Sequence, residues 1–471
     1  DSAFRPTHSA PLPPSMNASP SRLLLAPLLL VATACAETPT TDWPAWRGTG
    51  GTGVVAGAKP PVKWSDNRNI RWKAEVPGLG FSTPIVWKDR VYVLTAVDTG
   101  GEAAAAPAQA VPVPVEGGKG RGGKRGGPPG GFGGGMKPSS PHEFVVLALD
   151  RATGRTVWRQ VARREVPHEG KHATNSFASG SPITDGERLY VTFGSRGYYC
   201  YDLDGKLIWE KDLGDLRTRN SFGEGSSPAL AGDHLLITCD QEEGSFVVAL
   251  DKRTGREVWR KERAERSSWS TPLVVEAAGR RQAIVAAAGR TRSYDPATGE
   301  IIWEAGGLTE NVIPMPVTGH GLVYVMSGFR GYAIQAIRLD AKGDVTDSPA
   351  IVWNVRKSAP YVPSPVLSGD RLYMIKSNEA VLSCLDARTG AVLYQDQRLE
   401  GLRGMYASPL AAGGYVYLIG REGTAMVIRD AAQFEVVSSN QLDDRFDASP
   451  VILGKDLFLR GHRYLYCISE G

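Results

Sequence analysis

Eight short segments of this chain begin alike, with a proline that follows a small residue or Met and leads into a short apolar strand. These prolines are Pro84, Pro182, Pro228, Pro272, Pro316, Pro365, Pro409 and Pro450. From Pro182 onward they are separated by 46, 44, 44, 49, 44 and 41 residues. Each unit continues with a turn, an alternating strand such as RLYV or YVYL, a strand ending near Asp, and usually a last strand ending on Trp. Repeats of about 40 to 50 residues with four short strands are typical of β-propellers.

The repeats predict an all-β fold, an eight-bladed β-propeller of four-stranded blades over residues 70–471. The first two prolines are 98 residues apart, and an insertion at residues 99–142 supplies the excess. The last repeat stops at YLYCISEG, one strand short, whereas a strand around Trp72 precedes the first proline. We expect this N-terminal strand to complete the last blade, because a closed ring leaves no free sheet edges.

A second motif joins the third and fourth strands of most blades. It reads DRATGRTVW from Asp150, DKRTGREVW from Asp251 and DPATGEIIW from Asp295. Thr-Gly predicts the turn, where Gly supplies a positive φ, and the Trp is expected to pack against a neighbouring blade. The tryptophans with this structural docking role are Trp72, Trp158, Trp209, Trp259, Trp303 and Trp353.

This motif resembles the pyrroloquinoline quinone (PQQ) repeat, and the resemblance covers nearly all of residues 70–471. The seventh unit, DAAQFEVV, lacks both the Gly and the Trp, and Tyr394 replaces Trp in the sixth. The segment WPAWRG, from Trp43 to Gly48, is similar to the opening of exported bacterial PQQ-like propeller proteins. In architecture the chain also resembles the propeller scaffold lipoprotein of the outer-membrane β-barrel assembly machinery. The resemblance implies blade packing and is not evidence of a bound quinone.

The N-terminal region predicts export. Residues 1–15 have no apolar periodicity and are interpreted as an untranslated or disordered leader. Residues 16–34 are interpreted as a signal peptide, because their apolar run is too short to cross a membrane. Cys35 is a candidate lipid attachment site, and ordinary signal cleavage before it is the alternative. Residues 35–69 are expected to form a linker, and the mature protein to be periplasmic or anchored to the outer membrane.

Residues 99–142 are rich in Gly and Pro and are expected to be a disordered insertion within the first blade. Their basic residues are Lys119, Arg121, Lys124, Arg125 and Lys137. A loop expansion without function is one interpretation, and a tether to anionic lipid or cell-wall polymer is the other. The whole chain has 54 basic and 50 acidic residues, a bias too small to indicate a nucleic-acid partner.

Two short motifs resemble metal sites but have the wrong context. HEGKH, from His168 to His172, matches the H-E-x-x-H zinc signature, which works only on a helix. Gly170 interrupts it and no helical periodicity surrounds it, so we expect no zinc there. DLDG, at 202–205, is explained by a hairpin turn. We interpret Cys200, Cys239, Cys384 and Cys467 as core residues rather than disulfide partners.

Two near-copies, HATNSFASGSP and RTRNSFGEGSSP, precede Pro182 and Pro228. In propellers the strands that follow such loops line the central channel, so the loops should surround one mouth of it. Polar and aromatic residues converging on a concave mouth are the default binding-site hypothesis, and loops that only cap the strands are the alternative. The candidate site residues are His172, Asn175, Arg219, Asn220, Glu224, Trp269, Asn311, Tyr361, Tyr406 and Asp447.

These features predict a non-catalytic envelope binding or scaffold propeller, a monomer that presents its loops and channel mouth to a protein or small-molecule partner. No catalytic residue and no metal ligand is assigned, and no cofactor is expected. A PQQ-dependent quinoprotein dehydrogenase holding PQQ with calcium is the first alternative. It is disfavoured because the family's dehydrogenases have adjacent cysteines, and this sequence contains no Cys-Cys. Another propeller enzyme, acting on glycans, is the second alternative, since fold alone does not select a function.

Overall fold

The structure, a computed structural model, describes residues 41–100 and 135–470. The predictions for residues 1–15, for the signal peptide at 16–34, for Cys35 and for the greater part of the insertion lie outside the described residues. Within the described part of the chain, no helix has the length and apolar character needed to span a membrane.

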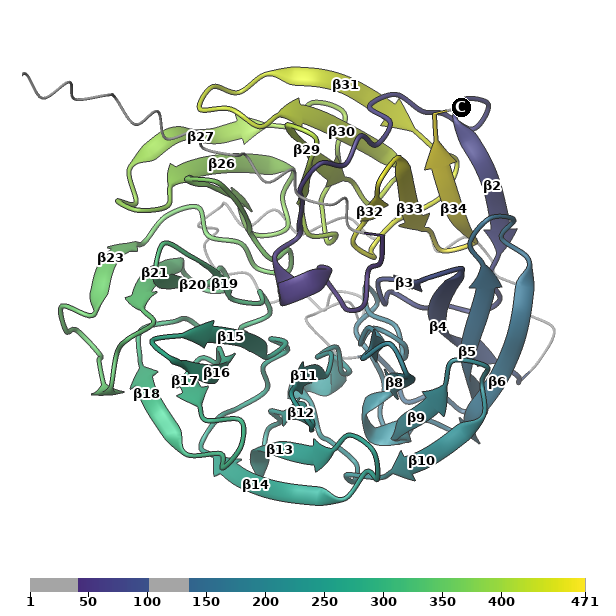
Figure 1. The fold of residues 1–471 in the computed structure, drawn as a ribbon, viewed down its shortest axis with the longest axis horizontal. Helices are drawn as coiled ribbons and strands as arrows, with labels where there is room; N and C mark the ends of the chain where they lie inside the picture. Colours follow the sequence, from purple (N-terminus) through teal and green to yellow (C-terminus); the bar gives the residue numbers. More distant parts are fainter. Residues whose placement is uncertain (1–40, 101–134, 471) are drawn as a thin grey trace, which may run out of the picture. The chain divides into compact units, whose positions relative to one another are not determined.

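Eight antiparallel sheets surround a central axis and form the blades of a propeller (Figure 1). Blade 1 consists of β3 (Ile85–Trp87), β4 (Arg90–Asp98), β5 (His142–Asp150) and β6 (Thr156–Glu165). Blade 2 consists of β7 (Ile183–Thr184), β8 (Arg188–Thr192), β9 (Tyr198–Asp202) and β10 (Leu207–Lys211). Blade 3 consists of β11 (Ala229–Ala231), β12 (His234–Cys239), β13 (Ser245–Asp251) and β14 (Glu257–Arg263). Blade 4 consists of β15 (Leu273–Ala277), β16 (Arg280–Val285), β17 (Thr291–Tyr294) and β18 (Ile301–Ala305).

The second half of the ring repeats this plan. Blade 5 consists of β19 (Val317–Gly319), β20 (Leu322–Ser327), β21 (Ala333–Arg338) and β23 (Ile351–Val355). Blade 6 consists of β24 (Val366–Ser368), β25 (Arg371–Ile375), β26 (Val381–Asp386) and β27 (Val392–Arg398). Blade 7 consists of β28 (Leu410–Ala412), β29 (Tyr415–Ile419), β30 (Thr424–Arg429) and β31 (Val436–Gln441). Blade 8 consists of β32 (Val451–Leu453), β33 (Asp456–Arg460), β34 (Tyr464–Ser469) and β2 (Ile70–Glu75).

The inner strand of every blade begins directly after one of the eight prolines. The predicted all-β, eight-bladed fold is therefore confirmed. In blade 8 the outer strand is β2, which pairs with β34 so that Trp72 lies opposite Cys467. In blades 1 to 6 the docking aromatic residue likewise lies opposite a small residue, as Trp209 does opposite Cys200. The four described cysteines are buried and unpaired.

Adjacent blades are joined by the tryptophan and the Asp–Thr–Gly turn together. Trp209 on β10 donates its indole N–H to the Lys252 carbonyl in the turn of blade 3, at 3.0 Å. In that turn Asp251 Oδ1 accepts from the Thr254 amide and hydroxyl, at 2.9 and 2.7 Å. Gly255 has a φ of 70°, and a Cβ there would lie 2.8 Å from the indole of Trp209. Trp72, Trp158, Trp259 and Trp353 donate in the same way to Arg151, Leu203, Pro296 and Ala387.

Two blades that depart from the motif use local substitutes. The long turn of blade 5 contains β22 (Gly343–Asp344), which pairs in parallel with β18 and places Gly343 opposite Trp303. Trp303 is fully buried and donates to the Gln282 side chain of its own blade, at 3.1 Å, instead of to a neighbouring turn. In blade 6, Tyr394 packs against Phe434, with ring centroids 5.8 Å apart.

Between blades 7 and 8 the missing tryptophan is supplied from the N-terminal region. Ser438 stands at the tryptophan position of β31 and its hydroxyl donates to the Val62 carbonyl. Trp64 is 3% exposed and stacks on Tyr417, with ring centroids 6.4 Å apart. Its backbone amide donates to the Asn440 side chain, at 2.8 Å. Trp64 therefore fills the interface that blade 7 leaves without an aromatic residue of its own.

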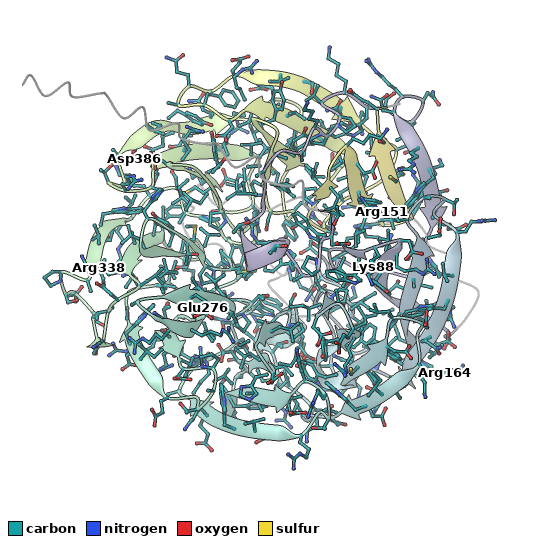
Figure 2. All side chains as sticks on the ribbon, in the orientation of Figure 1. Lys88, Arg151, Arg164, Glu276, Arg338 and Asp386 are labelled. Carbon is teal, nitrogen blue, oxygen red and sulfur yellow. The ribbon has the colours of Figure 1, made fainter. Side chains whose placement is uncertain are left out.

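Residues 41–55, which we call the strap, cross the centre of the ring as the purple segment in Figure 1. The strap contains η1 (Thr49–Gly51) and β1 (Val54–Val55), which extends the sheet of blade 7 by pairing with β28. It lies on the face that carries the turns within the blades. Arg151 of the β5–β6 turn donates to the carbonyls of Thr41 and Lys88, at 2.9 and 3.3 Å (Figure 2). One end of the channel is therefore covered by the chain's own residues.

Candidate functional site

The opposite end of the channel is the mouth that the candidate residues were expected to surround. In a four-stranded antiparallel blade, the loop between the second and third strands and the loop leading to the next blade open on the same face. Side chains from both kinds of loop meet at this mouth, in three hydrogen-bonded clusters.

The first cluster centres on Asp447, in the loop before β32. Its carboxylate accepts from Arg421 Nε and Nη2, at 2.5 and 3.2 Å, and lies 2.9 Å from His462 Nε2. The guanidinium of Arg421 lies over the ring of Tyr406, 4.1 Å from its centroid. The Tyr406 hydroxyl accepts from Thr174, at 2.9 Å, although the two residues precede the inner strands of blades 7 and 2. This bond crosses the mouth, because blades 7 and 2 are not neighbours.

Electrostatics keep this cluster in a defined charge state. Burial alone would raise the pKa of Asp447, but hydrogen bonds from His462 and Arg421 hold it below its usual value. Burial lowers the pKa of His172, and the positive charges of Arg421 and Lys171 lower it further. His172 lies 2.7 Å from the Thr174 hydroxyl through Nδ1. At neutral pH the cluster therefore holds a carboxylate and a guanidinium beside a neutral His172.

The second cluster joins blades 3, 5 and 6. Arg219, in η3 (Arg219–Ser221), donates to Glu310 and to the Asn311 side chain, at 2.7 and 3.2 Å. Asn311 in turn donates to the Tyr361 hydroxyl, at 3.3 Å. Tyr361 stacks on Phe329, with ring centroids 5.1 Å apart. Asn311 is buried with a φ of 55°, and burial raises the pKa of Tyr361.

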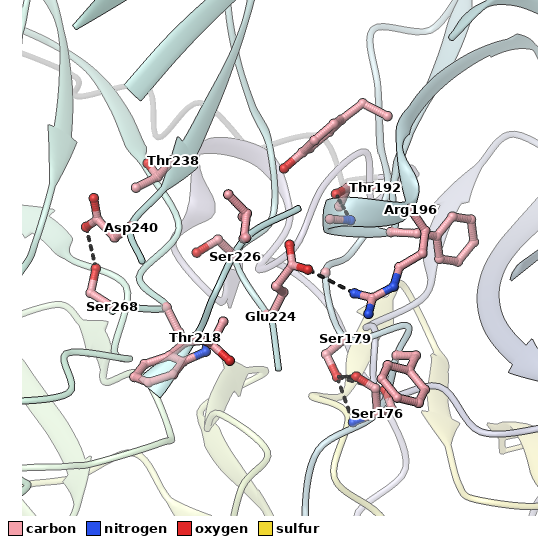
Figure 3. A pocket seen from close by; sticks show the side chains of 18 residues that line it. Ser176, Ser179, Thr192, Arg196, Thr218, Glu224, Ser226, Thr238, Asp240 and Ser268 are labelled. Carbon is pink, nitrogen blue, oxygen red and sulfur yellow. Dashed lines mark hydrogen bonds and ion pairs between the residues drawn. The ribbon is translucent and has the colours of Figure 1, made fainter. Parts of the chain in front are cut away.

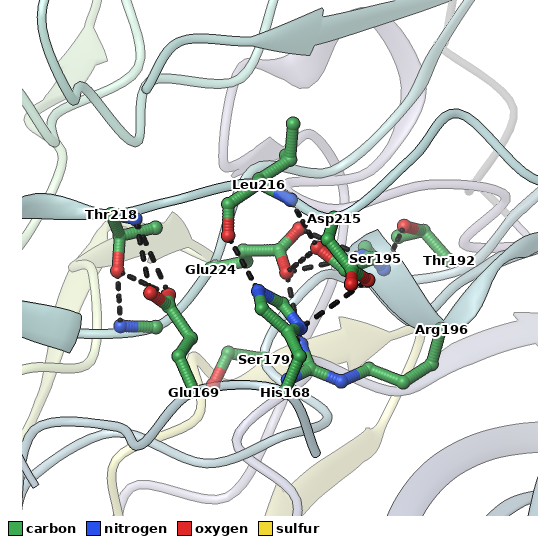
Figure 4. Close-up of polar contacts among 12 residues, drawn as sticks. His168, Glu169, Ser179, Thr192, Ser195, Arg196, Asp215, Leu216, Thr218 and Glu224 are labelled. Atoms are coloured by element: carbon green, nitrogen blue, oxygen red, sulfur yellow. Dashed lines mark hydrogen bonds and ion pairs between the residues drawn. The ribbon is translucent and has the colours of Figure 1, made fainter. Parts of the chain in front are cut away.

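The third cluster surrounds Glu224, in the loop before β11 (Figure 4). The carboxylate accepts from the Ser195 hydroxyl, at 2.7 Å, and from Arg196 Nη1, at 2.9 Å. Both partners lie in η2 (Gly194–Arg196), between the second and third strands of blade 2. Burial raises the pKa of Glu224 despite the opposing effects of Arg196 and Ser195. Glu224 is thus a structural bridge between blades 2 and 3.

The loops before Pro182 and Pro228 are also joined by hydrogen bonds from the remaining candidates. Asn175 donates to the carbonyls of Phe222 and Glu224, at 2.9 and 3.3 Å. Trp269 donates its indole N–H to the Gly223 carbonyl, at 2.6 Å. Asn220 is exposed, with a φ of 51°, and belongs to none of the three clusters. Nine of the ten candidates therefore belong to the three clusters or to the hydrogen-bonded loops that support them. The tenth, Asn220, lies at the surface.

A polar cavity lies beneath these loops (Figure 3). Its volume is about 30 Å³, and its walls include the hydroxyls of Thr192, Ser226 and Thr238 and the carboxylate of Asp240. Two buried lining atoms, Arg196 Nε and Thr238 Oγ1, have no hydrogen-bond partner within the described residues. About 10–15 Å³ of such cavity volume is enough to hold one water, so the cavity has room for one or two ordered waters that would satisfy these atoms.

The residues at the mouth do not fit PQQ. Sites for molecules of that size occupy about 300–1,000 Å³, an order of magnitude more than this cavity. Among residues 41–100 and 135–470, no three His, Cys, Asp or Glu side chains are grouped to hold a metal ion. The mouth itself is bridged by the Thr174–Tyr406 bond. No step of a quinone reaction is therefore derived at this mouth.

The HEGKH segment is a loop, as its context predicted. His168 Nε2 lies 2.7 Å from the Leu216 carbonyl, and Glu169 accepts from the Thr218 hydroxyl at 2.6 Å (Figure 4). In the DLDG turn, Asp202 accepts from the amides of Asp204 and Lys206, at 3.0 and 2.8 Å. In both segments the polar side chains form hydrogen bonds to main-chain groups of nearby loops and turns.

Sequence reasoning missed the partners that come from loops between second and third strands. These are Ser195, Arg196, Phe329, Arg421 and His462. A signal for them exists, because an Arg within two residues of a Gly recurs at this point of several blades, in GSRG, GFRG, GREG and GHR. These partners lie in the loops between second and third strands, which open on the same face as the loops that precede the prolines.

Comparison with known proteins agrees with this architecture. Among solved structures, BamB from Moraxella catarrhalis has 14% sequence identity and a TM-score of 0.50, covering 69% of this chain and 88% of that one. The quinohemoprotein alcohol dehydrogenase ADHIIG from Pseudomonas putida HK5 has 10% identity and a TM-score of 0.54, covering 91% of this chain and 80% of that one. At these identities the likeness shows the fold alone. No curated protein sequence matches the chain. A family model described as "Outer membrane protein assembly factor BamB" matches residues 142–310 and 243–470, and the chain belongs to that family.

Proposed function

We propose that this protein is a non-catalytic scaffold of the cell envelope that binds a protein partner over the open mouth of its channel. The observation that carries the proposal is the layer of side chains that bond to one another across the mouth, with Thr174 and Tyr406 as its central pair. These bonded side chains close the channel at its mouth. A closed mouth favours contact with the surface of a partner protein over insertion of a cofactor into the channel. The family to which the chain belongs is consistent with an envelope location.

The composition of the mouth supports a protein partner. Half-buried aromatic side chains lie around it, and Arg330, 63% exposed, lies over the ring of Phe329. Aromatic residues and Arg are enriched where proteins bind each other, and they carry most of the energy of such interfaces. The other aromatic residues of the mouth are Phe81, Phe222, Trp269, Tyr361 and Tyr406.

Site-specific photo-crosslinking in intact envelopes tests this proposal. A photoreactive residue in place of Arg330 should capture one defined protein. The control places the same residue at Val392, which is 52% exposed on an outer strand, and should not capture it. Phe329→Ala should weaken capture from the Arg330 position while the circular dichroism of the ring is unchanged. Capture of the same protein from Val392 but not from Arg330 would contradict the mouth as the binding surface.

A titration with PQQ, with and without calcium, tests the absence of a cofactor site. We expect no saturable binding by calorimetry or absorbance at high micromolar quinone. Saturable one-to-one binding that depends on calcium would show that the mouth opens to a cofactor and would contradict the scaffold proposal.

A further inference from the structure

We propose that the face opposite the mouth is a peptide-binding site for a Trp-Pro-x-Trp-Arg-Gly segment, and that the strap of a second copy of this chain can occupy it. In the single chain this site is filled by the chain's own strap. The inference is independent of the partner proposed for the mouth, since it concerns the other end of the channel.

The strap is held by main-chain hydrogen bonds of the kind that recognise extended peptides. Trp43 and Val86 of β3 exchange two such bonds, at 2.6 and 2.9 Å. The Thr184 amide of β7 donates to the Pro44 carbonyl, at 2.8 Å. β1 then adds to the edge of β28 in parallel register. Addition of a strand to an exposed sheet edge is a general mode of peptide binding, with side-chain pockets supplying specificity.

Arg47 is the charged anchor of the strap. It is 3% exposed, and its guanidinium donates to the Pro365 carbonyl of blade 6, at 2.6 Å, and to Gly51 and Thr52 of the strap, at 3.3 and 3.2 Å. No charged group of the described chain offsets its burial, which lowers its pKa to about 9. Of these three carbonyls only that of Pro365 belongs to the ring, so this buried bond is what the ring offers to an Arg at this position.

Two glycines make the strap fold back on its own anchors. Gly48 has a φ of 74°, and a Cβ there would lie 2.8 Å from the indole of Trp43. Gly53 has a φ of 67°, and a Cβ there would lie 2.5 Å from the Arg47 guanidinium. The bound shape therefore requires Gly at both positions, the last residue of the motif and Gly53 beyond it, because any other residue would displace an anchor.

The strap is separable from the ring that binds it. Ala56 and Gly57, which follow it, are both exposed. The next residues are anchored separately, since the Lys59 amide donates to the Gly454 carbonyl and Trp64 is buried between blades 7 and 8. Without the strap every sheet still has its four blade strands, and the sheet of blade 4 also keeps β22. An identical element joined by an exposed hinge can be exchanged between copies.

The site is tested with the full chain carrying a specific protease site in place of Ala56–Gly57, cut after folding. The probe is a fluorescent peptide of residues 41–55. We expect it to replace the cut strap and bind saturably. Peptide with Arg47→Ala should bind about 30-fold more weakly or worse, because a buried bond to a charged group is lost. Peptide with Thr49→Ala is the matched control and should bind like the original, because Thr49 is exposed.

Replacement is measured with excess peptide, so the site is never empty and the ring need not be stable without a strap. Failure of the original peptide to enter the cut protein, or equal binding of the Arg47→Ala peptide, would overturn the peptide site.

Exchange between copies is tested in the uncut chain, with donor dye on the strap at Thr49→Cys of one population and acceptor at Lys88→Cys of another. Energy transfer should appear only near millimolar concentration, because a tethered strap competes at about that effective concentration. No transfer after equilibration at that concentration would overturn the second copy as the partner.

Discussion

Replacing Trp64 tests the claim that the N-terminal region supplies the docking residue of the interface between blades 7 and 8. Truncation of a buried Trp to Ala costs about 3–5 kcal/mol, and Trp64 is 3% exposed and stacked on Tyr417. The expected loss lies in the upper part of this range, because Ser438 offers no aromatic group that could fill the space. For a ring of roughly 400 residues, the entropy of unfolding is about 0.8 kcal/mol/K, so the midpoint of thermal unfolding should fall by about 4–6 °C.

Urea unfolding followed by far-ultraviolet circular dichroism, with calorimetry for the midpoint, measures this effect. Val392→Ala on an outer strand is the control and should change the free energy of unfolding by less than about 0.5 kcal/mol. A loss below about 1 kcal/mol for Trp64→Ala would refute the reasoning, since it would mean that the interface closes without the indole.

Three further perturbations follow from the contacts. Gly255→Ala should destabilise by about 1–3 kcal/mol, because φ is positive there and the added Cβ meets Trp209 at 2.8 Å; urea unfolding measures it, and an unchanged midpoint would contradict the docking geometry. Glu224→Ala should cost about 3–5 kcal/mol by the same assay, because it leaves a buried guanidinium without its carboxylate, and a loss within 0.5 kcal/mol would contradict the bridge. Because the folded-state pKa of Asp447 is depressed, its contribution should be present above pH of about 4 and be lost as pH falls through the folded pKa. Asp447→Asn should reduce the loss of unfolding free energy at acid pH, measured by urea unfolding over a pH series. An unchanged loss would contradict this role of Asp447.

The ring could be predicted from sequence because its repeats obey local rules. A proline directly precedes each inner strand, and Thr-Gly marks the turn between the third and fourth strands in four of the blades. The position of Trp72 one strand before the first repeat indicated the strand that lies beside β34. These signals need only a few neighbouring residues.

The strap and the Trp64 interface could not be predicted, because their contacts join residues far apart in the chain. Nothing near Trp64 in sequence shows that blade 7 lacks an aromatic residue, and nothing near Arg47 shows that Pro365 will accept its hydrogen bond. The mouth was predicted in part. Tyr406 and Asp447 were recognised, whereas Arg421, which contacts both, was not, because it comes from the other kind of loop.

The pairing of β2 with β34 also determines when the ring can close during synthesis of the chain. The two strands lie roughly 390 residues apart, and closing so long a loop must wait until both have been made. At synthesis rates of about 5–20 residues per second, β2 leaves the ribosome roughly 20 to 80 s before its partner. During that interval the edge of β2 that pairs with β34 has no native neighbour, although Trp72 can already contact the Arg151 carbonyl of blade 1. The strand that finally closes the ring is thus the segment of longest exposure to aggregation, and it is where we expect a chaperone to hold the nascent chain.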